Sequence, residues 1–248
     1  MRVLTLNIHK GYTALNGRFM LHELKEAIRE VGADLVFLQE VQGEHREKAA
    51  REVRWPEAAQ YEFLADQVWK EFAYGQNAAY QHGHHGNAVL SHYPIVHAEQ
   101  VDVSTNRIEQ RGFLFCEIEL PVHGPLYAIC VHLGLTAVGR RKQLRMITDF
   151  IRAEVPEGAP LIVAGDTNDW SGVPTRKFTT ETGLFDAYES VRGRPALSFP
   201  SFAPVLSLDR IFVRGLDVVD AEVYSGGKWA ELSDHAALAA NLSVARIA

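Results

Sequence analysis

The chain is 248 residues long, 47% of them hydrophobic, and its formal net charge at pH 7 is -6. One large α/β or β-rich domain is common at this length. Proteins that bind long polynucleotides usually carry a basic excess, so the acidic balance argues against that class, although a local basic patch could override it. No apolar run approaches a membrane-spanning length, and residues 1–7 form a short strand pattern rather than a secretion signal. We therefore expect a monomeric cytoplasmic protein with one domain over residues 1–248.

Apolar runs bounded by turn residues alternate with helical patterns along the chain. The runs predict strands over residues 2–8, 34–38, 61–65, 72–80, 87–91, 96–103, 112–120, 126–133, 161–164, 206–213, 218–224 and 236–242. Helices are predicted over 19–31, 43–53, 138–155 and 174–182, and a histidine-rich loop over 82–86. Gly32 stands at the expected C-cap of the first helix. This order indicates an α+β domain whose sheets are covered by helices.

The two cysteines, Cys116 and Cys130, lie on the two strands of a predicted hairpin. If Leu120 faces Leu126 across the turn, Cys116 faces Cys130 directly. Neither cysteine belongs to a CxxC pair, and a cytoplasmic protein keeps its thiols reduced. We therefore interpret both as free thiols in the core rather than as a disulfide or a zinc site.

The most informative stretch follows the run over residues 161–164, and it reads Gly165-Asp166-Thr167-Asn168-Asp169-Trp170. Gly165 allows the chain to bend and to approach another group closely. Asp166 can hold a metal ion or take a proton from water, and Asn168 can donate hydrogen bonds to an anion without adding charge. This pairing suits attack by water on a negatively charged group. The alternative is an ordinary Asx-turn, in which both side chains bond backbone groups.

Other predicted strands begin or end with the same kind of polar residue, which suggests one site at a sheet edge. These residues are Asn7, Glu40, His132, Asp209, Asp234 and His235. Oxygen ligands such as Glu40, Asp234 and the Asn7 amide suit Mg²⁺ or Mn²⁺ rather than zinc. A histidine with a carboxylate on its other nitrogen becomes a stronger base or a stabilised cation, and Asp209 is available for that role.

Six short motifs follow one another along the chain. They are Leu4-Thr5-Leu6-Asn7-Ile8-His9, Leu38-Gln39-Glu40, His132-Leu133, Gly165-Asp166-Thr167-Asn168, Asp209-Arg210-Ile211 and Ser233-Asp234-His235. Together they resemble the endonuclease/exonuclease/phosphatase (DNase I-like) superfamily of Mg²⁺-dependent phosphoesterases. A narrower resemblance, to the small bacterial YbhP-like proteins, rests on residues 6–11, 72–75 and 84–91. One departure is Thr167, where many relatives have phenylalanine.

The resemblance implies a four-layer α/β-β/α sandwich, in which two packed mixed β-sheets are flanked by helices. It also implies a bound Mg²⁺, or Mn²⁺ in its place. Glu40 would hold this metal ion, with help from Asn7 and Asp234. The fold and the metal site are therefore expectations that a structure can check.

The resemblance also assigns catalytic roles. Asp166 would activate the attacking water, and Asn168 would steady the phosphoryl oxygens. His235, paired with Asp209, and His132 would contact the phosphate or move protons. Asp209 could instead pair only with the neighbouring arginine, and His132 could be a buried histidine whose bonds are satisfied in the core.

Further residues could contact the substrate. Arg111 could bind a phosphate with its guanidinium fork, or form a surface salt bridge. Asn87 and His85 could line the pocket, or belong to an ordinary polar loop. The basic helix start at Arg140–Arg145 could meet nucleic acid or anionic lipid, although a solvated helix face is the more common case. Trp170 is expected to shape its loop.

These features predict a Mg²⁺-dependent phosphoesterase in which water activated by Asp166 attacks phosphorus in line, with no covalent enzyme intermediate. Fold and motif do not fix the substrate, but the acidic balance favours a small or lipid-derived phosphodiester. A DNA endonuclease or exonuclease is the second hypothesis. A binding module without chemistry is the third, and the intact set of polar strand ends argues against it.

Overall fold

The computed structural model describes residues 1–13, 17–106 and 108–244, which form two six-stranded sheets. The first sheet has the strand order β11-β12-β1-β2-β4-β3, and the second has the order β5-β6-β7-β8-β10-β9. The strands are β1 (Arg2–Asn7), β2 (Leu35–His45), β3 (Glu71–Tyr80), β4 (Gly83–Ser91), β5 (Ile95–Asp102), β6 (Gly112–Leu120), β7 (Gly124–His132), β8 (Leu161–Asp166), β9 (Phe185–Asp186), β10 (Asp209–Arg214), β11 (Leu216–Tyr224) and β12 (Ala237–Val244). The pairs β1–β2 and β7–β8 are parallel and the other described pairs are antiparallel, so both sheets are mixed.

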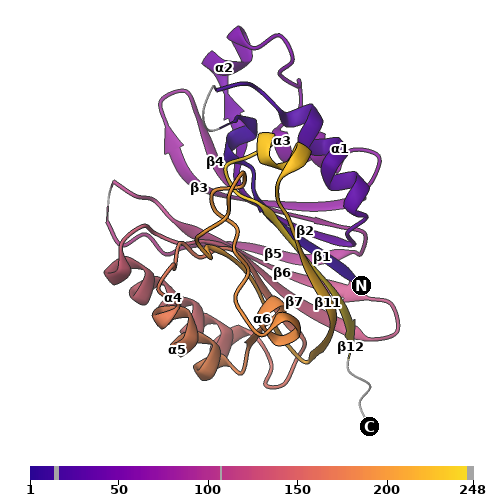
Figure 1. Ribbon diagram of the computed structural model, residues 1–248, viewed down its shortest axis with the longest axis vertical. Coiled ribbons are helices and arrows are strands. Elements are labelled where there is room, and N and C mark those ends of the chain that lie inside the picture. The colour runs from indigo at the N-terminus through magenta and orange to yellow at the C-terminus, as the bar shows by residue number, and fades with distance from the viewer. Residues whose placement is uncertain (14–16, 107, 245–248) are drawn as a thin grey trace.

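Helices connect the strands, and four of those described cover the outer faces of the sheets (Figure 1). They are α1 (Leu21–Val31), α2 (Arg46–Arg51), α3 (Gln60–Ala65), α4 (Ala137–Glu154), α5 (Val173–Thr182) and α6 (Ala187–Arg192), with 3₁₀ turns η1 (His9–Gly11) and η2 (Gly227–Glu231). Helix α1 ends at Gly32, whose φ of 65° confirms the predicted C-cap. Within the described part of the chain, no helix has both the length and the apolarity that crossing a bilayer requires.

The central strands are buried on both faces, which is why they appear in the sequence as continuous apolar runs. In β1, Val3 points between the two sheets whereas Leu4 packs beneath the helices. In β8, Ile162 and Val163 divide in the same way between the inner core and the helical layer. Alternate residues of one strand therefore stabilise two different layers.

Three hydrophobic cores join four layers. The inner core unites the facing sides of the two sheets, with Phe37 from the first sheet and Leu114 and Ile211 from the second. The second core lies between the first sheet and α1 with α3, and the third lies between the second sheet and α4 with α5. This arrangement confirms the predicted four-layer α/β-β/α sandwich.

Three element predictions are wrong. Residues 61–65 form helix α3, not a strand, because a run of five residues is too short for its periodicity to separate the two. The helix predicted over residues 43–53 is shorter, because β2 continues to His45 before α2 begins. The histidine-rich segment is no loop: most of it belongs to β4, which stays paired with β3 as far as Tyr80 opposite Gly83.

The predicted facing of the two cysteines is also wrong. Leu120 lies opposite Gly124, so the strands approach the turn more closely than expected and the register shifts by two residues. Cys116 therefore faces Ala128, and Cys130 faces Leu114. Both thiols are free and completely buried, which confirms that they belong to the core.

Candidate active site

The predicted polar residues meet between the two sheets at one end of the sandwich. Asn7 and Glu40 come from the first sheet, on parallel neighbours β1 and β2. In the second sheet, Asp166 stands in register with His132 on one side and with Asp209 on the other. Asp234 and His235 precede β12, which pairs with β1. The expectation of one sheet edge is therefore wrong, because both packed sheets contribute side chains to the same end.

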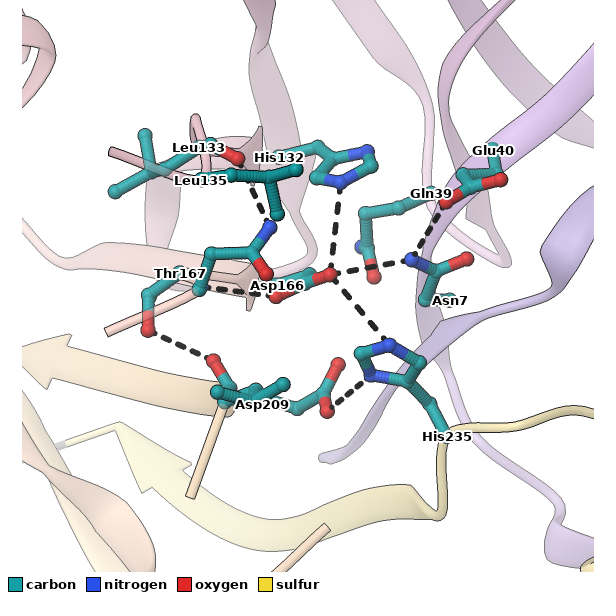
Figure 2. Close-up of polar contacts among 12 residues, drawn as sticks. Asn7, Gln39, Glu40, His132, Leu133, Leu135, Asp166, Thr167, Asp209 and His235 are labelled. Atoms are coloured by element: carbon teal, nitrogen blue, oxygen red, sulfur yellow. Dashed lines mark hydrogen bonds and ion pairs between the residues drawn. The ribbon is translucent and has the colours of Figure 1, made fainter. Parts of the chain in front are cut away.

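Asp166 lies at the centre of this cluster and is 1% exposed. Its Oδ2 accepts a hydrogen bond from Asn7 Nδ2 at 3.1 Å (Figure 2). The same oxygen lies 3.5 Å from His132 Nε2 and 3.8 Å from His235 Nε2. Burial raises the pKa of the Asp166 carboxyl, while the charge of His235 acts in the opposite direction. One carboxylate therefore lies within reach of two histidines and an amide.

The turn after β8 positions this carboxylate. Gly165 has a φ of 145°, and a Cβ there would overlap the Val131 carbonyl oxygen, so the close approach of the strands requires glycine. Asn168 has a φ of 49°, and its backbone N–H donates to Asp166 Oδ1 at 2.9 Å. Its Nδ2 donates to the Leu133 carbonyl at 3.0 Å. Asn168 thus secures the turn, and its contact with phosphoryl oxygens stays a prediction.

Two neighbours of this turn have structural contacts. The Thr167 hydroxyl donates to the Leu208 carbonyl at 2.7 Å, so the residue that departs from the family pattern is buried with its hydrogen bond satisfied. Asp169 Oδ2 accepts hydrogen bonds from the Thr175 backbone N–H at 3.1 Å and from its hydroxyl at 3.0 Å. Asp169 therefore shapes the loop before α5.

His235 is paired with Asp209, as predicted. His235 Nδ1 lies 2.7 Å from Asp209 Oδ2, and the two side chains are 7% and 0% exposed. Ser198 Oγ donates to the same aspartate oxygen at 2.6 Å. Burial lowers the pKa of His235, but the charges of Asp209 and Asp166 more than offset burial and raise the pKa to about 10. His235 is therefore an imidazolium at neutral pH, and both of its nitrogens are donors.

His132 has the opposite protonation state. Its side chain is 6% exposed. Burial and the nearby Arg111 guanidinium lower the pKa of His132 to about 4, against the attraction of Asp166 and Glu40. A neutral and a charged imidazole thus lie on two sides of one carboxylate. Groups whose environments move their pKa values apart in this way are a signature of acid–base sites.

Glu40 is delivered by a β-bulge, in which two residues of β2 stand opposite one residue of β4. Bulges redirect side chains and are common beside active sites. Glu40 Oε1 accepts a hydrogen bond from Asn7 Nδ2 at 3.2 Å, and Oε2 lies 2.7 Å from Lys10 Nζ. Burial raises the pKa of Glu40, but His132, Lys10 and the Asn7 hydrogen bond together hold it well below its usual range.

Asp234 forms a second pair of the same kind. Its Oδ2 lies 3.3 Å from His9 Nδ1. Burial raises the pKa of Asp234, but the hydrogen bond with His9 and nearby positive charge more than offset burial and lower it. The same hydrogen bond raises the pKa of His9. Asp234 therefore stays anionic although it is largely buried.

The residues present fit the divalent cation that the motifs imply. Glu40 and Asp234 are both anionic, and their side chains remain 17% and 19% exposed. Partly accessible carboxylate oxygens are the ligands that Mg²⁺ and Mn²⁺ prefer. Asn7 directs its Nδ2 toward Glu40 and Asp166, while its Oδ1 accepts the His9 backbone N–H at 3.0 Å. The role of Asn7 as a metal ligand stays a prediction.

A second group of ligand types is present nearby. Asp166, Asp209 and His235 offer ligand atoms that all lie within 4.8 Å of one another. A protonated imidazole has no free lone pair for a metal ion. This buried group therefore suits proton handling better than cation binding.

Backbone strain is concentrated at the same place. Four non-glycine residues of the site have positive φ: His9 (45°), Lys10 (58°), Glu40 (56°) and Asn168 (49°). Such conformations cost energy and persist where the surrounding structure holds them, often at functional sites. The clustering supports the assignment of this end of the sandwich as the active site.

The three predicted substrate contacts differ in position. Arg111 is 14% exposed, and its Nη2 lies 3.1 Å from Glu109 Oε1. Asn87 is completely buried and donates to backbone carbonyls of the second sheet at 2.9 and 3.2 Å, so it joins the sheets beneath the site. Burial and the charge of Lys10 lower the pKa of His85 to about 4. Contact of Arg111, Asn87 or His85 with substrate stays a prediction.

Several residues that support the site have no role among those predicted from the sequence. Lys10 and His9 form the ion pairs with Glu40 and Asp234. Their place in the motif after β1 was the available signal. Ser198 had no such signal, because it reaches Asp209 from a separate loop.

The chain is similar to known proteins in sequence and in fold. The model of the Endonuclease/Exonuclease/phosphatase family matches residues 4–235. The chain is 47% identical over 242 residues to the uncharacterized protein YbhP of Escherichia coli K12, covering 97% of this chain and 95% of that protein. The mannosyl-6-phosphatase of Bacteroides thetaiotaomicron shares the fold with a TM-score of 0.72 at 15% identity, over 98% of this chain and 99% of that one. D. rerio TDP2 complexed with single-strand DNA product gives 0.69 at 18% identity, over 98% of both chains. The chain belongs to the endonuclease/exonuclease/phosphatase family.

Proposed function

We propose that this protein is a divalent-metal-dependent phosphoesterase that hydrolyses a small or lipid-derived phosphodiester. Mg²⁺ is the expected cofactor and Mn²⁺ a substitute for it. Family membership supports the reaction class. One observation carries the proposal: the buried carboxylate of Asp166 lies between a neutral and a protonated histidine, beside two partly exposed carboxylates that stay anionic.

The buried residues handle protons in this proposal: His132, Asp166 and Asp209 from the second sheet, and His235 from the segment before β12. Asp166 takes a proton from the attacking water, and its raised pKa makes it a better base than an exposed aspartate. The water oxygen forms a bond to phosphorus as the bond to the leaving oxygen breaks in line. The His235 imidazolium, held by Asp209, donates a hydrogen bond to a phosphoryl oxygen on which negative charge develops. His132 orients water or phosphate without adding charge.

Glu40 and Asp234 would hold the divalent cation. When bound, this cation offsets the negative charge of the phosphoryl oxygens. Lys10 and His9 keep the two carboxylates anionic and in position through their ion pairs. The partial exposure of this group gives an ion a route from solvent.

The test is an assay of the purified protein with Mg²⁺ on three kinds of substrate. These are phosphodiesters derived from phospholipid headgroups, single-stranded DNA and duplex DNA with an abasic site. We expect headgroup hydrolysis that EDTA abolishes and that Asp166→Ala lowers about 10³-fold, the scale of a lost general base. Asp217→Asn, at an exposed carboxylate on β11, is the matched control and should keep full activity. Hydrolysis that survives in Asp166→Ala would refute the proposed role of this residue.

A DNA nuclease is the second candidate. The observation in its favour is the shared fold with TDP2, which was solved with a single-strand DNA product. Cleavage of either DNA substrate that is lost in Asp166→Ala would overturn the preference for small or lipid-derived substrates. No hydrolysis of any substrate, together with no heat of Mg²⁺ binding, would favour a non-catalytic binding module.

A further inference from the structure

The outer face formed by α4 and α5 carries concentrated positive charge on an otherwise acidic protein. Both helices begin at the end of the sandwich where β7 and β8 deliver His132 and Asp166, and both cover the second sheet (Figure 1). A groove of about 560 Å³ runs between them. The exposed cations of this α4–α5 face are Arg141, Lys142, Arg145, Arg152, Arg176 and Lys177.

Most of these cations lack an acidic partner. Arg152 lies 3.9 Å from Asp149, and Lys177 lies 3.6 Å from Glu181. The other four have no carboxylate within 4.0 Å among residues 1–13, 17–106 and 108–244; they are Arg141, Lys142, Arg145 and Arg176.

The first turn of each helix also lacks negative charge. Neither α4 nor α5 has an acidic residue in its first turn, and the four cations without partners fall in the first half of each helix. A cluster of cations with few acidic neighbours attracts polyanions, so this face indicates an anionic partner outside the chain.

An apolar rim borders these cations at the end nearest the active site. Its side chains are Leu135 (59% exposed), Val138 (58%), Trp170 (56%) and Val173 (68%). The buried Arg140 ties two of its segments together. Its Nη1 donates to the Leu135 carbonyl at 2.7 Å, and its guanidinium carbon lies 4.6 Å from the centre of the Trp170 ring. Arg140 therefore holds the Leu135 and Trp170 segments of the rim in place.

We propose that the α4–α5 face and its apolar rim dock the protein on a bilayer that contains anionic phospholipid. The rim side chains enter the interface and the cations contact lipid phosphates. Interfacial binding combines these two contributions, buried apolar area and attraction of Lys and Arg to anionic lipid. Because the rim borders the active site, docking brings that end of the second sheet toward the bilayer surface.

Single-stranded nucleic acid is the other polyanion that a basic groove could take. Proteins that bind it stack successive bases on exposed aromatic side chains. Among the described residues that line the groove, the one aromatic side chain is Phe178, which is 2% exposed. The rim adds a single aromatic residue, Trp170, to three aliphatic ones. The surface therefore favours a lipid interface.

This inference deepens the proposed function by naming a membrane as the place where the substrate is met, but vesicle binding does not depend on hydrolysis. Flotation of Asp166→Ala should equal that of the wild-type protein. If the wild-type protein binds vesicles but hydrolyses none of the substrates, only the proposed function is refuted. If the wild-type protein hydrolyses a substrate but does not bind vesicles, only the docking surface is refuted.

The experiment is flotation of the full chain with vesicles of phosphatidylcholine alone, or of equal parts phosphatidylcholine and phosphatidylglycerol. The protein should bind only the anionic vesicles, and more weakly as salt rises. Each cation at an anionic surface contributes about a fivefold factor, so Arg141→Glu/Arg145→Glu should lower the partition coefficient by on the order of 25-fold or more. Val173→Ser should lower it several-fold, because less apolar area enters the interface.

Two matched controls separate the face from general effects. Arg51→Glu/Lys70→Glu makes the same change of net charge at exposed positions elsewhere. Val219→Ser alters a valine that is 68% exposed, as Val173 is. Both should bind vesicles as the wild-type protein does, and every variant should keep its thermal unfolding midpoint.

Three outcomes would overturn the proposal. The first is absence of binding to anionic vesicles. The second is a loss in the control variants equal to that in Arg141→Glu/Arg145→Glu. The third is tight binding of a labelled single-stranded oligonucleotide that requires Arg141 and Arg145 while vesicles are not bound, which would assign the face to nucleic acid instead.

Discussion

The active site has two halves that differ in their access to water. The proton half consists of Asp166, His132, Asp209 and His235, whose side chains are 0–7% exposed. The cation half consists of Glu40, Asp234, His9 and Lys10, whose side chains are 17–36% exposed. Burial changes pKa values, whereas partial exposure lets an ion enter and leave. This contrast supports the proposal that the buried half, drawn from the second sheet and from His235 before β12, handles protons and that the partly exposed half holds the metal ion.

The two halves also differ in how their charged side chains are paired. In the proton half, His132 is kept neutral and His235 is kept charged around a single carboxylate. In the cation half, each carboxylate faces one basic side chain, Lys10 or His9. Asn7 connects the halves, because its Nδ2 donates to both Glu40 and Asp166. Because each half nevertheless has its own charge partners, we expect a substitution in one half to leave the measurable property of the other half largely intact.

The largest effect that would test this division is expected from Asp209→Asn. Removing the charge beside His235 lowers the pKa of that histidine, so kcat/KM near pH 8 should fall about 100-fold, the scale of one acid–base group. The wild-type rate should decline only above about pH 10, as His235 loses its proton. The decline should move to lower pH in the variant. An unchanged alkaline limb in the pH–rate profile would show that His235 is not the titrating group.

Asp209→Asn should also change how the stability of the fold depends on pH. The pKa of His235 in the folded protein, about 10, lies above its ordinary value of 6.5. The protonated pair therefore stabilises the fold fully below pH 6.5, and this contribution is lost as pH rises through about 10. The free energy of unfolding, measured with denaturant, should be higher for the wild-type protein than for Asp209→Asn, and this difference should narrow between pH 6.5 and about 10. A difference that widens toward pH 10 would contradict the positive charge assigned to His235.

A smaller effect is expected in the cation half from Lys10→Met. Lys10 occupies the same carboxylate that would bind the metal ion, so its removal should tighten Mg²⁺ binding about fivefold, the scale of one partly exposed ion pair. The alkaline limb of the pH–rate profile should not move. Lys25→Met, which breaks a Lys–Asp pair away from the site, is the control for titration calorimetry. Weaker binding of Mg²⁺ in Lys10→Met would mean that Lys10 supports the ion.

The sequence predicted the fold and the order of the site residues better than it predicted their contacts. The polar motifs around Asp166 and His235 identified the family, and the family implied the sandwich. The bulge that directs Glu40 inward depends on how β2 pairs with β4, which no local pattern encodes. The support of Asp209 by Ser198 depends on the path of a loop far from the motif.

The errors have a related cause. A strand and a short helix share the same apolar pattern over residues 61–65. The register of Cys116 depends on where the hairpin turn closes, and the residues over 121–125 allowed more than one closure. Local sequence therefore indicated where most elements lie and which chemistry they carry, while the type of the shortest element and the pairing and register of strands came from the packing of the whole chain.

The most direct test of the division into two halves is calorimetric titration of Mg²⁺ at neutral pH into the wild-type protein, Glu40→Gln and Asp166→Asn. The two halves predict that Glu40→Gln loses measurable binding, because it removes a charged oxygen ligand. Asp166→Asn should bind Mg²⁺ with nearly the wild-type affinity although it is inactive. Binding that is lost in Asp166→Asn and kept in Glu40→Gln would contradict the assignment of the metal ion to the first sheet.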